Sequence, residues 1–188
     1  MDESPKKLIG ETRVLIPMSK GRIRMCDYGN EQFGVCNIFL VNEPLAGFRK
    51  VKITTKKCKV DWAEFIKEIA DLIYPKADKI TLAMDNLGTH TADALYERYE
   101  PAEAKRIWDR FEFVYTPKHG SWLIIAEIEL NVVNNQCLGR RINTIAKVAD
   151  EVQVWETARN GFKQKINWQF TTNQARNKLK RLYPSCDR

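Results

Sequence analysis

Two carboxylates of this chain occupy positions that are costly for a charge, and these positions indicate chemistry. Asp85 directly follows the apolar run Ile80–Met84, and Glu127 lies in the apolar stretch WLIIAEIEL. A carboxylate in apolar surroundings is destabilised unless it is paired, protonated or bound to a cation. Carboxylates brought together at a sheet edge are the ligands that hard divalent cations require. The sequence therefore suggests a metal site, and the alternative is that both acids lie on a solvated edge.

The remaining ligands are less well defined by spacing. Two metal ions that act on the attacking and leaving oxygens of a phosphodiester, roughly 4 Å apart, need several carboxylates between them. Glu129 is two residues from Glu127 on a predicted helix, so the two side chains point in different directions and at most one faces Asp85. A further carboxylate should come from an earlier strand beside that of Asp85. Spacing does not choose among its candidates, which are Asp2, Glu3, Glu11 and Asp27.

The elements that must position these acids follow from the hydrophobic pattern. Runs rich in β-branched and aromatic residues predict strands over 35–41, 48–55, 79–84 and 111–115. Apolar residues at helical spacing predict helices over 59–74, 92–99, 102–110, 122–138, 142–162 and 172–182. The turn at 42–47 makes the first two strands an antiparallel hairpin, with Arg49, Lys50 and Lys52 expected on its outward side. A hairpin followed by strand–helix units predicts an α/β domain with a mixed sheet and helices on its faces.

Composition excludes several functional classes. The five cysteines are widely spaced without a CxxC pair, and only two histidines occur, which argues against a zinc site. A glycine-rich phosphate loop and a GxSxG motif are both absent, which excludes P-loop, dinucleotide-binding and serine-hydrolase interpretations. No stretch is apolar enough to span a membrane. The formal net charge of +7 favours a polyanionic partner, and the basic run at 50–59 and the basic last helix either follow a DNA backbone or form solvated faces.

Several long motifs resemble one known family. MDNLGTH, YTPKHGSWLIIAEIEL and QCLGRRI are similar to the catalytic domain of bacterial insertion-sequence transposases related to the mariner group, within the DDE superfamily of endonucleases. MDESPKKLIGETR resembles the first catalytic strand of that domain and its continuation. The resemblance implies an α/β fold of the ribonuclease-H-like type: a mixed five-stranded sheet flanked by helices, with the first strand truncated here. It assigns residues 1–142 to the DDE endonuclease domain and residues 143–188 to a C-terminal helical extension of it.

The resemblance also implies a site. Its catalytic and metal-binding acids fall on Asp2 in MDE, on Asp85 in MDN and on Glu127, the first glutamate of AEIE. They imply two Mg²⁺ ions, for which Mn²⁺ can substitute, and phosphodiester hydrolysis followed by strand transfer at transposon ends. His90 either supports the acids or caps the following helix. Four residues are candidates either to contact the substrate or to support the acids: Asn86, His90, Lys118 and His119.

The implied partners are nucleic acid and protein. They are double-stranded DNA, as transposon ends and target, and a second copy of the chain in a homodimeric DNA complex. In the family a helix-turn-helix region precedes the first acid, so a separate N-terminal segment of that kind is a further expected partner. The expected location is the bacterial cytoplasm, at the nucleoid, with no membrane association. A rival interpretation is a catalytically inactive remnant that binds DNA non-specifically or only assembles with a partner chain.

Overall fold

The computed structural model describes residues 1–13, 16–23, 28–85, 87–117, 124–178 and 180. Its first layer is an antiparallel sheet of β1 (Asp2–Glu11), β2 (Asn30–Glu43) and β3 (Phe48–Thr54), with β2 in the centre. Ile38, Phe39 and Leu40 are consecutive in β2 and all buried, because this strand is covered on both of its faces. The predicted hairpin is therefore confirmed, and the N-terminal segment that resembles a first catalytic strand is a strand.

One side chain of the hairpin differs from the sequence-based expectation. Arg49 was expected outside with Lys50 and Lys52, yet it is 1% exposed whereas both lysines are partly exposed. Successive residues of a strand point to opposite faces, so Arg49 cannot share a face with Lys50. It faces the covering helices instead, where it meets Glu129.

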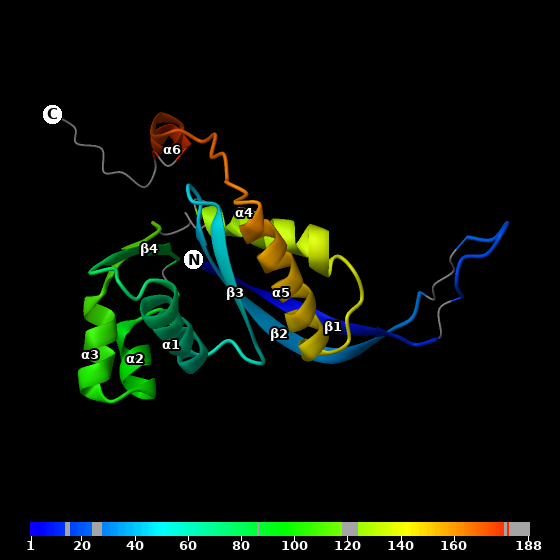
Figure 1. Ribbon diagram of the computed structural model, residues 1–188, viewed down its shortest axis with the longest axis horizontal. Helices are drawn as coiled ribbons and strands as arrows, with labels where there is room; N and C mark the ends of the chain where they lie inside the picture. The colour runs from blue at the N-terminus through cyan, green and yellow to red at the C-terminus, as the bar shows by residue number, and fades with distance from the viewer. Residues whose placement is uncertain (14–15, 24–27, 86, 118–123, 179, 181–188) are drawn as a thin grey trace.

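The second layer is a parallel pair of strands with a group of helices beside it. β4 (Ile80–Met84) pairs with β5 (Phe111–Tyr115), as their apolar runs predict. Figure 1 shows α1, α2 and α3 gathered on one side of this pair. The helices are α1 (Lys59–Glu68), which continues into the π-helical turn η1 (Ile69–Ile73), α2 (Ala92–Arg98) and α3 (Pro101–Asp109).

The later helices cover the three-stranded sheet. α4 (Ile125–Val133) continues into η3 (Asn134–Leu138), and α5 (Ile145–Gly161) runs along β3 (Figure 1). The short, basic α6 (Thr172–Lys178) follows, with no buried side chain. Each of these helices lies where the periodicity predicts one, although the predicted start of α4 falls outside the described residues.

Two hydrophobic clusters correspond to the two layers. One joins β4 and β5 to the helices α1 to α3, with Trp62 and Phe65 among its buried members. The other joins the three-stranded sheet to α4 and α5, with Leu130 and Val152 among its members. Alternate residues of β2 divide between them: Phe39 and Val41 belong to the first, and Ile38 and Leu40 to the second. The central strand β2 therefore separates the clusters and packs in both.

The expected single five-stranded sheet is not what the described residues form. They contain five strands, but these make one sheet of three strands and one of two. The two sheets meet where β1 begins: the Met1 ammonium donates a hydrogen bond of 2.7 Å to the carbonyl oxygen of Ala83 in β4. One hydrogen bond is too few for a strand ladder. The mixed α/β character is confirmed, while the single sheet is not.

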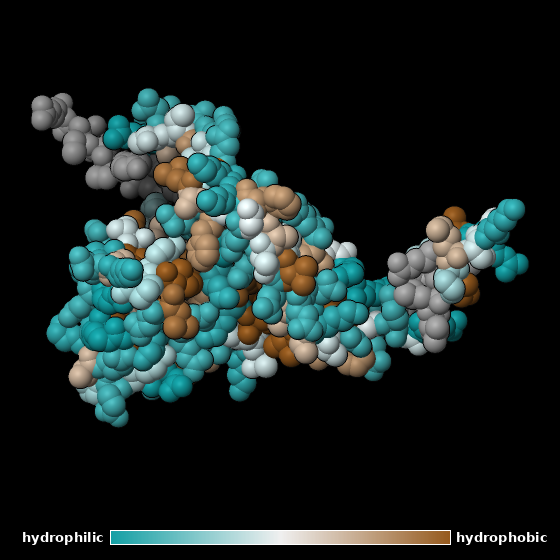
Figure 2. Space-filling model, in the orientation of Figure 1, coloured by the Kyte–Doolittle hydropathy of each residue, from teal (hydrophilic) through white to brown (hydrophobic). Residues whose placement is uncertain are grey.

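A two-stranded arm, formed by the C-terminal end of β1 and the N-terminal end of β2, projects from the rest of the molecule (Figure 1). Its outer part carries the exposed apolar side chains Ile16, Met18, Ile23 and Tyr28. Figure 2 shows apolar atoms on this projecting arm, separated from the main body. The arm belongs to neither hydrophobic cluster. Among the described residues, no helix is both long enough and apolar enough to cross a membrane.

Candidate metal centre

The three predicted acids lie at or near the ends of three different elements. Asp2 is the first residue of β1, Asp85 follows the last residue of β4, and Glu127 is in the first turn of α4. Asp2 and Asp85 are partly buried, and Glu127 is exposed. Since β1 and β4 touch at the Met1–Ala83 hydrogen bond, Asp2 and Asp85 lie beside the junction of the two sheets.

The electrostatics show that Asp2 is affected by the charges of the other two acids. Burial raises the pKa of Asp2, the hydrogen bond from the Glu3 amide (2.8 Å) opposes this, and the charges of Asp85 and Glu127 raise the pKa further. Like charges close together disfavour ionisation, and a bound cation removes that penalty. Asp2 and Glu127 also line one cavity of about 280 Å³, together with the amide side chains of Asn131 and Asn134.

The two neighbouring glutamates of α4 have different roles. Glu127 is exposed and lines the cavity with Asp2. Glu129 is fully buried, and its carboxylate pairs with Arg49 (3.1 Å) and Arg159 (2.9 Å). Helical geometry turns residues two apart to different sides, so one glutamate reaches the cavity and the other anchors α4 to β3 and α5. Of the two, Glu127 alone is left for a cation.

The other early acids are occupied elsewhere or lie outside the described residues. The Glu3 carboxylate is 3% exposed, lies 2.7 Å from the Lys57 ammonium and is close to His90. Glu11 forms an ion pair with Arg141 at the far end of β1. Asp27 falls outside the described residues. Asp2 is therefore the early acid whose ionisation is coupled to both Asp85 and Glu127.

Of the predicted supporting residues, only His90 can be placed. Asn86, Lys118 and His119 fall outside the described residues. His90 is completely buried, and its Nδ1 lies 2.9 Å from Asp85 Oδ1. It does not cap the next helix, because Thr91 occupies the N-cap position of α2. The support of His90 by Glu3 and Lys57 was missed by sequence reasoning, although the adjacency of Glu3 to Asp2 was a usable signal.

The three acids offer the kind of ligand atom that a hard divalent cation prefers. Asp2, Asp85 and Glu127 offer carboxylate oxygens only, which Mg²⁺ and Mn²⁺ prefer. Within the described part of the chain, however, no three His, Cys, Asp or Glu side chains are close enough together to hold a metal ion. The charges of Asp85 and Glu127 raise the pKa of Asp2 without the three carboxylates having converged to coordination distance.

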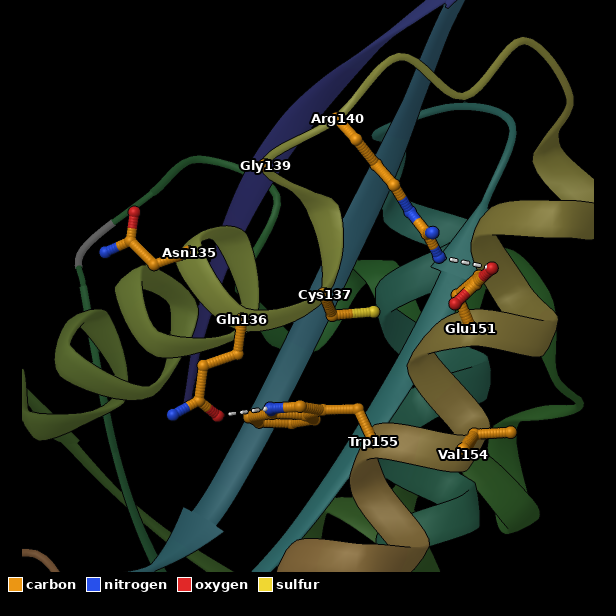
Figure 3. Close-up of a pocket in the computed structure, with 8 residues that line it drawn as sticks. All are labelled: Asn135, Gln136, Cys137, Gly139, Arg140, Glu151, Val154 and Trp155. Atoms are coloured by element: carbon orange, nitrogen blue, oxygen red, sulfur yellow. Dashed lines mark hydrogen bonds and ion pairs between the residues drawn. The ribbon is translucent and has the colours of Figure 1, made fainter. Parts of the chain in front are cut away.

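A separate cavity of about 410 Å³ lies between η3 and α5, away from the acids (Figure 3). Its polar side chains bond to one another: Trp155 Nε1 donates to Gln136 Oε1 at 3.0 Å, and Arg140 pairs with Glu151 (Figure 3). These contacts join η3 to α5. They use the polar groups that a ligand would need, so this cavity is a packing feature of the second hydrophobic cluster.

Comparison with known proteins identifies a family for the chain. Neither the curated proteins nor the solved structures contain a match to the chain. The family model of the DDE superfamily endonucleases matches residues 1–149, which include Asp2, Asp85 and Glu127. The match covers most of the 188 residues. The chain therefore belongs to the DDE superfamily endonuclease family.

Proposed function

We propose that this chain is the catalytic domain of a DNA transposase of the mariner-related, bacterial insertion-sequence type. It hydrolyses phosphodiesters at transposon ends and then transfers the ends to target DNA. The observation that carries the proposal is that the charges of Asp85 and Glu127 both raise the pKa of Asp2, although the three acids come from three different elements of an endonuclease family member. Two Mg²⁺ ions, or Mn²⁺ in their place, are the cofactors, and the two sheets together correspond to the sheet of the ribonuclease-H-like fold.

The three acids have one role each in this proposal. Asp2 and Asp85 present oxygens from two sheets that meet at Ala83, and Glu127 presents its carboxylate from α4 across the shared cavity. Metal ions held by these residues would supply Lewis acidity to the attacking and leaving oxygens of the scissile phosphodiester. Asn86, Lys118 and His119 bind DNA or support the acids.

We also propose an organisation for the chain, which the packing supports. Residues 1–142 form the catalytic domain, and 143–188 are its helical extension. In support, α5 places Val148, Val152 and Trp155 in the hydrophobic cluster that contains α4. The partners are double-stranded DNA, a second copy of the chain in the DNA complex, and a helix-turn-helix segment that reads the transposon ends. The protein is located in the bacterial cytoplasm, at the nucleoid.

One observation favours a second candidate. Since no three potential ligands converge among the described residues, the chain is alternatively an inactive remnant that binds DNA through charge alone or assembles with a partner chain. The two candidates differ in whether the protein binds a metal ion.

Metal-dependent stabilisation tests the proposal. Mn²⁺ should raise the melting temperature of the wild-type protein, because a ligand that binds only the folded state stabilises it. At a ligand concentration of about 100 times the Kd, the free energy of unfolding rises by about 2.7 kcal/mol. Asp85→Asn should abolish the rise, whereas Asp78→Asn, a change to an exposed acid outside the site, should keep it. DNA carrying the element's ends should be nicked only with metal present. Absence of both the stabilisation and the nicking in wild type would favour the inactive remnant.

A further inference from the structure

A row of four charged side chains runs from the β3–α1 connection to Asp85. Lys57 at one end is exposed, Glu3 and His90 in the middle have buried side chains, and Asp85 at the other end is partly buried. His90 lies inside the protein with no exposed surface, and its two ring nitrogens face two carboxylates. Nδ1 is 2.9 Å from Asp85 Oδ1, and Nε2 is 3.6 Å from Glu3 Oε1. The same Glu3 oxygen is 2.7 Å from the Lys57 ammonium. The signs alternate along the row, from Lys57 through Glu3 and His90 to Asp85.

The imidazole ring has little freedom to move. Trp62, itself fully buried, stacks on it with ring centroids 5.6 Å apart and planes 25° apart. The backbone of His90 is also held: its amide donates to the Leu87 carbonyl (2.9 Å), and the Tyr115 hydroxyl donates to its carbonyl (3.0 Å). The ring is therefore fixed in its plane by Trp62 and in its position by the turn and by β5.

The charges of the row support one another. Burial by itself lowers the pKa of His90, and the contacts with Asp85 and Glu3 outweigh burial and raise it to about 9. The bond from His90 lowers the pKa of Asp85, and the His90 and Lys57 contacts together overcome burial to lower that of Glu3. Buried charges persist in folded proteins when each is paired in this way.

The row connects two elements that carry proposed metal ligands. Glu3 follows Asp2 on β1, and Asp85 follows β4, so the ring of His90 fixes one strand relative to the other. A carboxylate at a strand end otherwise rotates about its side-chain bonds. We propose that His90, held by Glu3 and Lys57, is a positioning residue that binds Oδ1 of Asp85 and directs Oδ2 of Asp85 toward the cation. This inference rests on the proposed function and names the groups that prepare its site.

Two substitutions of His90 separate its two contacts. In His90→Asn the new side-chain amide nitrogen occupies roughly the place of Nδ1, so this variant keeps a donor for Asp85 and loses the contact with Glu3. In His90→Gln the amide nitrogen lies near the place of Nε2, so this variant keeps a donor for Glu3 and loses the contact with Asp85. Both variants lose the buried imidazolium, so a merely structural role predicts similar defects in both.

Mn²⁺ affinity is the first measurement, by titration of the paramagnetic signal of free Mn²⁺ at constant pH. His90→Gln should weaken binding about 10-fold or more, the range seen when a group that orients a metal ligand is lost. His90→Asn should remain within about threefold of wild type, since it keeps the Asp85 contact. Equal losses in the two variants would overturn the positioning role.

Thermal unfolding in EDTA is the second measurement and needs no metal. The Asp85→Asn change is introduced into each His90 variant, and the fall in melting temperature that it causes is compared. The fall should be larger in the His90→Asn protein than in the His90→Gln protein, because only the His90→Asn side chain still contacts position 85. Equal shifts would overturn the inference. If both His90 variants fail to fold, Glu3→Gln replaces them and should weaken Mn²⁺ binding several-fold. Glu11→Gln is the control on the same strand and should leave Mn²⁺ binding unchanged. Equal Mn²⁺ affinities in these two variants would again overturn the inference.

The two proposals can fail separately. If wild-type protein binds no Mn²⁺, the proposed function is wrong, and the unfolding experiment in EDTA still decides whether His90 holds Asp85. If wild type binds Mn²⁺ and the His90 variants do not differ, the function stands and the positioning role is wrong.

Discussion

At the scale of single residues, the surroundings of a carboxylate decide what it does. Glu127 and Glu129 have the same chemistry and are near neighbours on α4, yet one is exposed beside Asp2 and the other is buried between two guanidinium groups. Glu129 is committed to structure because Arg49 is almost completely buried and has this carboxylate as its charge partner. Glu127 has the charge of Asp2 within range and no such commitment among the described residues.

A matched pair of substitutions tests this division. Glu127→Gln should leave the melting temperature without metal nearly unchanged and should remove the Mn²⁺-dependent rise. Glu129→Gln should lower the free energy of unfolding by about 3–5 kcal/mol, because Arg49 loses a buried partner. Urea unfolding and thermal shifts with and without Mn²⁺ measure both effects. A strong loss of stability in Glu127→Gln would contradict the assignment.

At the scale of elements, α5 protects the free edge of the three-stranded sheet. The Arg49 amide donates to Asn160 Oδ1 (2.9 Å), and the Val51 amide donates to Glu156 Oε2 (2.6 Å), so side chains of α5 satisfy the edge of β3. Asn160 also donates to the Arg49 carbonyl at 2.8 Å. An unprotected edge strand is prone to pair with other chains, and these contacts prevent that. They also fix the residue, Arg49, that holds Glu129 and hence α4.

The β2–β3 turn should be sensitive to the addition of one methyl group. Gly47 has φ +70°, and a Cβ there would lie 2.3 Å from the carbonyl oxygen of Lys163, just after α5. Gly47→Ala should lower the free energy of unfolding by about 2–3 kcal/mol, since backbone atoms must shift in addition to the strain of positive φ. Gly21→Ala is the control, because φ is +77° but the space is open, and it should cost about 1 kcal/mol. Equal costs in urea unfolding would contradict the predicted clash.

At the scale of the whole molecule, a net charge of +7 does not identify the DNA-binding surface. Four lysines of the basic run at 50–59 each lie within ion-pair distance of a carboxylate: Lys50, Lys52, Lys57 and Lys59. These pairs link β3, and the segment that follows it, to β1 and to the helices around it. The last helix, α6, has no buried residue, and the Arg176 and Lys178 of its last turn are exposed, whereas Lys50 and Lys52 are only partly exposed. We expect α6 to contribute more to DNA binding than the earlier run.

The salt dependence of DNA binding measures this contribution. The double variant Arg176→Gln, Lys178→Gln should reduce the slope of log affinity against log salt by about 2, since each phosphate contact contributes about 0.9. Lys52→Gln, which removes a lysine near Glu64, should leave the slope unchanged. Fluorescence anisotropy with a labelled duplex at several salt concentrations gives the slopes. A larger change in Lys52→Gln would reassign the surface to β3.

The sequence by itself determined the elements and the chemical class of the site. Local periodicity places the hairpin, β4, β5 and the helices, because apolar patterning follows the period of each element. The long motifs around Asp85 and Glu127 indicate the DDE family, and the family model confirms it. The apolar stretch around Glu127 also indicates that a charge is buried there, but the buried carboxylate is that of Glu129, and Glu127 is exposed.

Only the tertiary structure decided which charged groups meet. Arg49 and Glu129 are far apart in the sequence, and their pairing depends on how α4 packs against β3. The same holds for the row through His90, whose members come from β1, the β3–α1 connection and the turn after β4. The division into two sheets also arises at this level, because strand pairing depends on which backbone groups come within hydrogen-bond distance. Such contacts join distant parts of the chain, and local propensity carries no information about them.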